Sequence, residues 1–198
     1  MISAIVLAAG KSRRMGAPKL LLPVAGQPMI ARIVDEVLRA AVDDIIVVID
    51  RTESGVANAL VGRRVRFVVN SRNESEMLDS LRCGLREVRD DCEAVLVVLG
   101  DQPDPCADVI NSLIRGLREG NCGIVVPTFR GRRGHPLLFA LRYRDEVMRR
   151  YDDVGLRGLL HAHPDDVGEV ETTGPSVLED IDRPEDYARR LRSGGNRP

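Results

Sequence analysis

The chain has 198 residues, of which 43% are hydrophobic and 30% are charged. This balance is ordinary for a folded globular protein, and the length predicts one domain over residues 1–192, followed by a frayed tail at 193–198. Because 29 basic residues offset 30 acidic ones, no global field points to a nucleic acid or an anionic membrane as a partner.

Short apolar runs alternate with helical patterns along most of the chain. The expected strands are residues 3–7, 45–49, 65–69, 94–99, 123–126, 136–139 and 167–171. The expected helices are residues 28–42, 75–88, 107–117, 141–151, 155–163 and 184–191. Most strand runs are continuously apolar, which is typical of strands covered on both faces, whereas 167–171 alternates like a strand near an edge. The pattern predicts an α/β fold with a Rossmann-like doubly wound sheet.

Two sequence features favour a cytoplasmic protein. No apolar run approaches the ~18 residues that a bilayer span requires. The four cysteines include no CxxC pair, so their spacing indicates neither a zinc knuckle nor a disulfide framework. We expect reduced, mostly structural thiols.

The densest functional signal follows the first expected strand and occupies residues 7–19. It reads Leu-Ala-Ala-Gly-Lys-Ser-Arg-Arg-Met-Gly-Ala-Pro-Lys, with four cations at Lys11, Arg13, Arg14 and Lys19. In an open parallel sheet, ligands bind beyond the carboxyl ends of the strands. Glycines there let the backbone approach a ligand closely, and successive amides can hold phosphate oxygens. The segment is neither a Walker loop nor a GxGxxG fingerprint. It predicts a phosphate site, and a basic surface loop is the alternative.

Acidic residues follow at two later points. Asp101 comes directly after the expected strand 94–99, where a carboxylate beside a phosphate loop can hold Mg²⁺ together with water and phosphate oxygens. Asp180 and Asp182 project to the same side if their segment is extended. Each position also has a purely structural alternative. Asp101 could belong to the junction between a strand and a turn, and Asp182 could be the N-cap of the helix that begins near Pro184.

Taken together, these segments resemble the MobA-like NTP transferase family, and most closely its molybdenum cofactor cytidylyltransferase branch. Residues 7–19 match the family pattern LAAGxSxRMGxxK throughout. The family's GDQP and RGHP segments correspond to residues 100–103 and 133–136, and its DIDTPEDY ending corresponds to 180–187 with Arg183 in place of Thr. The resemblance covers nearly the whole chain, in order.

Two weaker matches contain departures from the family pattern. Asn70, Met77, Ser80 and Gly84 resemble the family's N…GMxxSxxxG stretch, but Glu76 stands where Gly usually precedes the Met. Residues 152–157 resemble its GDxGxR segment, but Asp152 replaces the opening Gly. The change at Glu76 concerns the loop near the base or ribose of the nucleotide, and the change at Asp152 concerns the binding of the acceptor.

The resemblance implies a three-layer α/β/α fold with a mixed, mostly parallel sheet, and a magnesium-dependent nucleotidyltransferase. The implied catalytic residues are Arg14, Lys19 and Asp101, and the implied metal ligands are Asp101 and Asp182. The implied nucleotide-binding residues are Leu7, Ala8, Ala9, Gly10, Ser12, Arg14, Lys19, Ser80, Gly84 and Asp101. Gly134 and His135 would bind the acceptor, which is the phosphate of the molybdopterin cofactor.

CTP is the nucleotide that the resemblance implies. Related guanylyltransferases carry LAGG in the first motif, and Ala9 occupies the first of those glycine positions, which favours cytosine over guanine. The acceptor oxygen would attack the α-phosphorus in line, and the cations would offset a repulsion of about 4 kcal/mol per pair of like charges at 4 Å. A molybdenum enzyme could receive the product. The alternatives are a guanylyltransferase, a transferase for another phosphorylated acceptor, and a non-catalytic accessory protein that hands on nucleotide or cofactor.

Overall fold

A mixed sheet organises the computed structural model, which describes residues 1–10, 15–51, 54–71, 76–102 and 106–193. The strand order is β10-β7-β9-β6-β1-β4-β5, with β8 paired to β7 and a separate two-stranded β2-β3 hairpin. The strands are β1 (Ile2–Ala8), β2 (Pro23–Val24), β3 (Gln27–Pro28), β4 (Asp44–Asp50), β5 (Arg66–Asn70), β6 (Ala94–Leu99), β7 (Ile124–Phe129), β8 (Arg132–Arg133), β9 (Leu137–Ala140) and β10 (Val167–Glu171). The helices are α1 (Met29–Arg39), α2 (Ser54–Ala59), α3 (Met77–Glu87), α4 (Ala107–Glu119), α5 (Arg144–Arg149), α6 (Arg157–Ala162) and α7 (Pro184–Ser193).

Most strand pairs in the sheet are parallel. Strand β1 runs parallel to β4 and β6, β4 to β5, and β7 to β10. Strands β9 and β8 are the exceptions, because β9 lies antiparallel between β6 and β7 and β8 pairs antiparallel with β7. The predicted mixed, mostly parallel sheet is therefore confirmed, and β10 lies at a sheet edge as its alternating sequence predicted.

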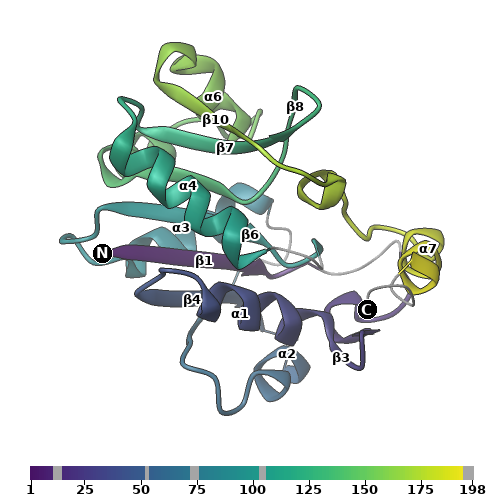
Figure 1. The fold of residues 1–198 in the computed structure, drawn as a ribbon. Helices are drawn as coiled ribbons and strands as arrows, with labels where there is room; N and C mark the ends of the chain where they lie inside the picture. The colour runs from purple at the N-terminus through teal and green to yellow at the C-terminus, as the bar shows by residue number, and fades with distance from the viewer. Residues whose placement is uncertain (11–14, 52–53, 72–75, 103–105, 194–198) are drawn as a thin grey trace.

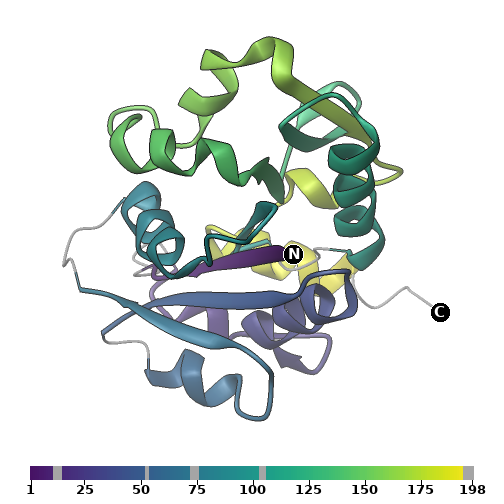
Figure 2. The same ribbon diagram turned by 90° about the vertical axis from the view of Figure 1, so that its left-hand side faces the viewer.

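Helices cover both faces of the sheet, as Figures 1 and 2 show. On one face, α1, α2 and α4 pack against strand residues such as Val6, Val47 and Leu96. On the other face, α3, α5 and α6 pack against the intervening residues of the same strands, such as Ile5 and Val95. Successive residues of a buried strand point to opposite faces, so the continuous apolar runs feed two separate cores. This is the three-layer α/β/α arrangement that we expected.

The expected elements differ from the observed ones in a few places. Helix α1 ends at Arg39 rather than at residue 42, because Ala40 is extended and the chain turns toward β4. The expected helix 141–151 divides into a 3₁₀ turn, η2 (Leu141–Tyr143), and α5. Helix α2 was not expected, since its six residues are too few to display a helical period. No helix in the described part of the chain is long and apolar enough to cross a membrane.

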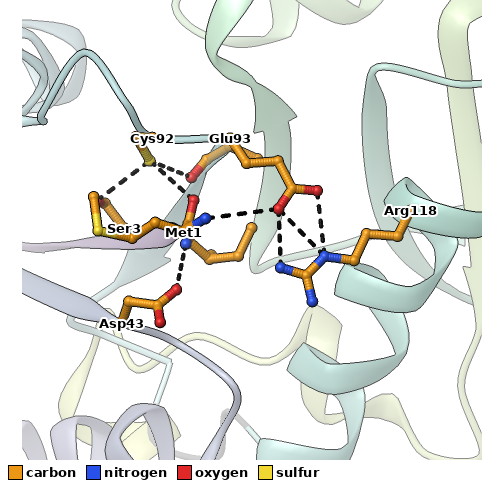
Figure 3. A network of polar contacts seen from close by, with 8 residues as sticks. Met1, Ser3, Asp43, Cys92, Glu93 and Arg118 are labelled. Atoms are coloured by element: carbon orange, nitrogen blue, oxygen red, sulfur yellow. Dashed lines mark hydrogen bonds and ion pairs between the residues drawn. The ribbon is translucent and has the colours of Figure 1, made fainter.

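A polar network fixes the amino edge of the sheet (Figure 3). The backbone N–H of Ile2 donates to Asp43 Oδ2 at 2.6 Å. The buried Cys92 thiol lies 3.0 Å from the carbonyl oxygen of Ala94 and 3.4 Å from that of Met1. All four cysteines are free thiols, and Cys92 has the structural role that we expected. These contacts hold β1 at its start.

We predict that Ile5→Ala lowers the free energy of unfolding by about 4 kcal/mol, in the upper part of the range for buried Ile-to-Ala changes. Ile5 is fully buried and packs tightly against Gly84, since a Cβ on Gly84 would lie only 2.6 Å from Ile5 Cγ2. Because glycine has no side chain, it cannot fill the cavity that Ile5→Ala leaves. Urea denaturation measures the change. The control Val61→Ala, at a side chain that is 77% exposed, should stay within about 0.5 kcal/mol of the parent. A similar small change in Ile5→Ala would contradict the packing described for this face.

Candidate active site

The candidate site lies at the carboxyl edge of the sheet. Strands β1, β4, β5 and β6 are mutually parallel neighbours, so their carboxyl ends meet at one edge. Ala9 and Gly10 leave β1 there, and Asp101 follows β6 at the same edge. The half-buried Ala9 packs against the α3 side of the core, while Gly10 is exposed. The edge is where an open parallel sheet binds its ligands.

Lys19 is bound to two carboxylates at this edge. It begins the 3₁₀ turn η1 (Lys19–Leu21), which the buried Leu20 anchors in the core. Lys19 Nζ donates to Asp101 Oδ2 at 3.0 Å and to Asp182 Oδ1 at 3.0 Å. The Lys19 side chain is only 12% exposed, against 29% for Asp101 and 39% for Asp182. The structure therefore brings together three predicted site residues from distant parts of the sequence.

Backbone contacts explain how Asp101 and Asp182 reach the same place. The N–H of Gly100 donates to the carbonyl oxygen of Leu7 at 3.0 Å, which ties the end of β6 to the end of β1. A Cβ at Gly100 would lie 2.6 Å from that oxygen, so only glycine fits. The N–H of Ile181 donates to the carbonyl oxygen of Asp101 at 2.9 Å, and the Ile181 side chain is buried. The segment around residue 182 is thus attached directly to the turn after β6.

The end of this segment is held by a different carboxylate. Asp186 Oδ2 accepts the backbone N–H groups of Asp182 at 3.3 Å and of Arg183 at 3.0 Å, at the start of α7. Asp186 thereby satisfies two amide groups just before the helix, while the N-cap role considered for the Asp182 side chain stays a prediction. The Tyr187 hydroxyl also donates to the carbonyl oxygen of Pro23 at 2.7 Å, which ties α7 to the β2-β3 hairpin.

The electrostatics of the site are dominated by its carboxylates. Burial on its own lowers the pKa of the Lys19 ammonium, but Asp101 and Asp182 outweigh that effect and raise the pKa above its ordinary value. Burial raises the pKa of the Asp180 carboxyl, and the negative charges of Asp182 and Asp101 raise it further. Negative charge is thus concentrated at this point, and Lys19 offsets part of it.

The two carboxylates that bind Lys19 fit the chemistry of a magnesium site. Mg²⁺ is usually held by one or two carboxylates, with water and substrate phosphate oxygens completing its octahedron. Asp101 and Asp182 offer oxygens that already converge on one cation. Within the described residues, no larger group of His, Cys, Asp and Glu side chains is arranged to hold a metal. The fit therefore rests on these two carboxylates and on oxygens that a phosphate ligand brings.

His135 lies next to the acidic cluster. The antiparallel register of β6 and β9 sets Val97 opposite Leu137, and His135, two residues before Leu137, is close enough for the Asp101 charge to act on its imidazole. The backbone N–H of His135 donates to the carbonyl oxygen of Val177 at 2.9 Å. Burial lowers the pKa of the His135 imidazole, Asp101 acts in the opposite direction, and Arg157 lowers it further. Burial therefore favours the neutral form of the His135 imidazole.

Gly134 has a packing role in the structure. A Cβ at this position would lie 2.1 Å from the carbonyl oxygen of Val177, in the 3₁₀ turn η4 (Pro175–Leu178). The backbone N–H of Gly134 donates to the carbonyl oxygen of Pro127 at 2.8 Å. Its close approach to η4 thus accounts for a glycine here, and its role in binding an acceptor stays a prediction.

On the α3 side of the site, Ser80 and Gly84 also make structural contacts. The Asn70 amide donates to Ser80 Oγ at 3.0 Å, and both side chains are buried where β5 ends. Gly84 lies against Ile5 and Val48 of the sheet, where a Cβ would be too close. The nucleotide-binding roles predicted for Leu7, Ala8, Ser80 and Gly84 stay predictions. Ser12 and Arg14 lie outside the described residues.

Both departures from the family pattern have local partners. The backbone N–H of Glu76 donates to Asp79 Oδ2 at 3.3 Å at the start of α3. Arg82 donates to Asp152 Oδ1 at 2.5 Å and to the carbonyl oxygen of Arg150 at 2.7 Å, which attaches the turn after α5 to α3. Sequence reasoning missed this Arg82 contact, because nothing in the local pattern relates residues 70 positions apart.

We predict that His135 makes the fold less stable at acidic pH. The folded protein binds a proton at His135 more weakly than the unfolded chain does, so stability falls as the pH drops below the ordinary histidine pKa of about 6.5. His135→Gln should therefore lose less unfolding free energy than the parent between about pH 7.5 and pH 5.5. Urea denaturation at each pH tests this, with the exposed His161→Gln for comparison. An equal loss in His135→Gln and the parent would contradict the prediction.

Comparison with known proteins places the chain in a family. The model of the MobA-like NTP transferase domain matches residues 4–167. The purine catabolism protein PucB of Bacillus subtilis is 30% identical over 193 residues, which are 92% of this chain and 92% of PucB. The bifunctional protein GlmU of Caldicellulosiruptor saccharolyticus is 34% identical over 118 residues, and the match covers 58% of this chain but only 25% of GlmU.

Solved structures agree with that placement. Rv0371c from Mycobacterium tuberculosis H37Rv superposes with a TM-score of 0.86 at 30% identity, over 96% of this chain and 98% of that one. A nucleotidyl transferase from Methanothermobacter gives a TM-score of 0.84 at 28% identity, over 98% and 97% of the two chains. The chain therefore belongs to the MobA-like NTP transferase domain family, a family of nucleotidyltransferases.

Proposed function

We propose that this chain is a cytidylyltransferase that transfers CMP from CTP to the phosphate of the molybdenum cofactor and releases pyrophosphate. The observation that carries the proposal is the meeting of Lys19, Asp101 and Asp182 at the carboxyl edge of the sheet. This is a cation and a pair of carboxylates next to the loop that follows β1. A metal-bound triphosphate needs both kinds of group, because a polyanion and a divalent cation must be held together.

The roles of the residues follow from their charges. Asp101 and Asp182 would hold Mg²⁺, which when bound supplies positive charge to the triphosphate and the leaving pyrophosphate. A crystal structure of Rv0371C is a complex with manganese, at 29% identity to this chain, which supports a divalent ion. Lys19 and Arg14 would bind phosphate oxygens, and the backbone of Ala9 and Gly10 would lie against them. These contacts hold the α-phosphorus in place for attack and stabilise the charge that develops on the leaving group.

The acceptor would approach from the side of His135. Its phosphate oxygen is already an anion at neutral pH, so the protein need not supply a nucleophile. The neutral imidazole of His135 can hydrogen-bond the acceptor without adding charge, and Arg157 contributes positive charge nearby. The molybdopterin phosphate is favoured because residues 133–136 resemble the cofactor branch of the family. A molybdenum enzyme would then receive the product in the cytoplasm.

CTP is the nucleotide proposed because Ala9 stands where guanylyltransferases carry glycine. Ala9 is half-buried just after β1, and we infer that its methyl group borders the nucleoside pocket. Ser80 and Gly84 of α3, with Ala8, would line the same pocket.

We predict that the purified protein releases pyrophosphate from CTP, and not from GTP, when Mg²⁺ and molybdenum cofactor are present. An enzyme-coupled pyrophosphate assay measures this, with cofactor omitted as the control. Preference for GTP would keep the transfer reaction and overturn the assignment of the base. If neither nucleotide reacts although one binds, other phosphorylated acceptors must be tried. Failure with all of them would favour a non-catalytic carrier.

We predict that Asp101→Asn and Lys19→Met each lower kcat/KM by at least about 100-fold, the loss expected when a group that stabilises transition-state charge is removed. Both variants should keep a cooperative urea transition, since neither side chain belongs to the apolar core. The matched control Asp108→Asn removes a carboxylate from the first turn of α4 and should stay within about twofold. Near-parental turnover in a folded Asp101→Asn variant would refute the proposed site.

A further inference from the structure

Lysine is rare in this chain, and one of its two lysines is at the site. Of the 29 basic residues, two are lysines, Lys11 and Lys19, and the other 27 are arginines. Nearly all cationic side chains of this protein are therefore arginines, and we looked for a property of lysine that position 19 requires. The guanidinium of arginine is a rigid planar fork, whereas lysine ends in a compact point charge on a flexible stem.

The Lys19 ammonium binds the same two carboxylate oxygens that would hold a metal. Its nitrogen lies 3.0 Å from Asp101 Oδ2 and 3.0 Å from Asp182 Oδ1. A Mg²⁺ ion lies closer still to its ligands, about 2.1 Å from each oxygen. An ion bound to these same two oxygens would therefore lie no more than about 5 Å from Nζ, the sum of the two bond lengths, and two cations this close repel each other strongly.

We propose that the Lys19 ammonium and the divalent metal are alternative occupants of the space between Asp101 and Asp182. In the protein without metal, Lys19 holds the two carboxylates together and offsets their charge. When the metal enters, the ammonium leaves and binds the nucleotide's phosphate oxygens. This inference rests on the proposed function, and it adds an order of binding: the free protein binds metal weakly, and the metal enters together with the nucleoside triphosphate.

The local structure suits such an exchange. The backbone at position 19 is fixed by η1, by the buried Leu20 and by the hydrogen bond from the N–H of Met29 to the carbonyl oxygen of Leu22, which is 3.0 Å long. The exchange therefore needs only the four-carbon side chain to rotate. The carboxylates are also held independently of Lys19, through Gly100 and Ile181, so they stay close together after it leaves.

Metal binding without nucleotide tests the competition. Mn²⁺ binding to the full chain, measured by electron paramagnetic resonance, should be tighter in Lys19→Met by at least about tenfold, because the ammonium no longer competes for the two carboxylates and no longer repels the metal. The matched control is Arg183→Met, which removes the same charge from the residue next to Asp182 and should change affinity by no more than about twofold. Equal or weaker Mn²⁺ binding by folded Lys19→Met would overturn the proposal.

A second measurement uses the parent protein alone. With only two lysines, ¹⁵N-lysine labelling gives two side-chain ammonium signals, and Lys19→Arg assigns them. Saturation with diamagnetic Mg²⁺, alone or with the α,β-methylene analogue of CTP, should shift the Lys19 signal. A saturated metal site with an unchanged Lys19 signal would mean that metal and ammonium coexist, and the proposal would be wrong.

The outcomes separate this inference from the proposed function. If the parent transfers CMP but Lys19→Met binds Mn²⁺ no more tightly, the function stands and the exchange is refuted. If Mn²⁺ displaces Lys19 but no acceptor reacts with CTP to release pyrophosphate, the exchange stands and the transfer reaction is refuted.

Discussion

The contact between one lysine and two aspartates is the interaction on which the candidate site depends. Lys19, Asp101 and Asp182 come from three separate parts of the sequence, and Lys19 Nζ joins the two carboxylates at 3.0 Å each. Two carboxylates this close repel each other, and a partly buried site screens that repulsion less than water does. A cation between them therefore stabilises the site. The same need for positive charge makes the site suitable for a metal-bound triphosphate.

The fold meets this requirement through its sheet edge. Parallel strands bring the ends of β1 and β6 side by side, and glycine at position 100 lets them approach until its N–H reaches the Leu7 carbonyl oxygen. The chain then returns from η4 to α7 and pairs Ile181 with the backbone of Asp101. At the opposite edge, the contacts of Asp43 and Cys92 fix the start of the central strand (Figure 3). The reactive groups thus lie on a rigid frame, which is what catalysis by positioning requires.

The sequence predicted the strands and layers well, because burial on two faces leaves a direct trace in continuous apolar runs. A mixed sheet was expected from the family resemblance only, and no strand was predicted to be antiparallel, since an apolar run of four residues does not reveal the direction of β9. Helix α2 was not predicted, because its six residues are too few to show helical periodicity. The motifs singled out Lys19, Asp101 and Asp182, which the structure brings into contact, and their roles stay predictions. Roles that depend on distant neighbours were not predictable: Gly134 against the Val177 carbonyl oxygen, Asn70 on Ser80, and Arg82 on Asp152.

The most direct test of this account is a crystal structure of the protein with Mn²⁺ and the α,β-methylene analogue of CTP, in which anomalous scattering locates the metal. The account predicts one manganese ion bound to both Asp101 and Asp182, with the Lys19 ammonium moved onto the triphosphate. Manganese bound elsewhere, or a nucleotide seated away from the ends of β1 and β6, would contradict it.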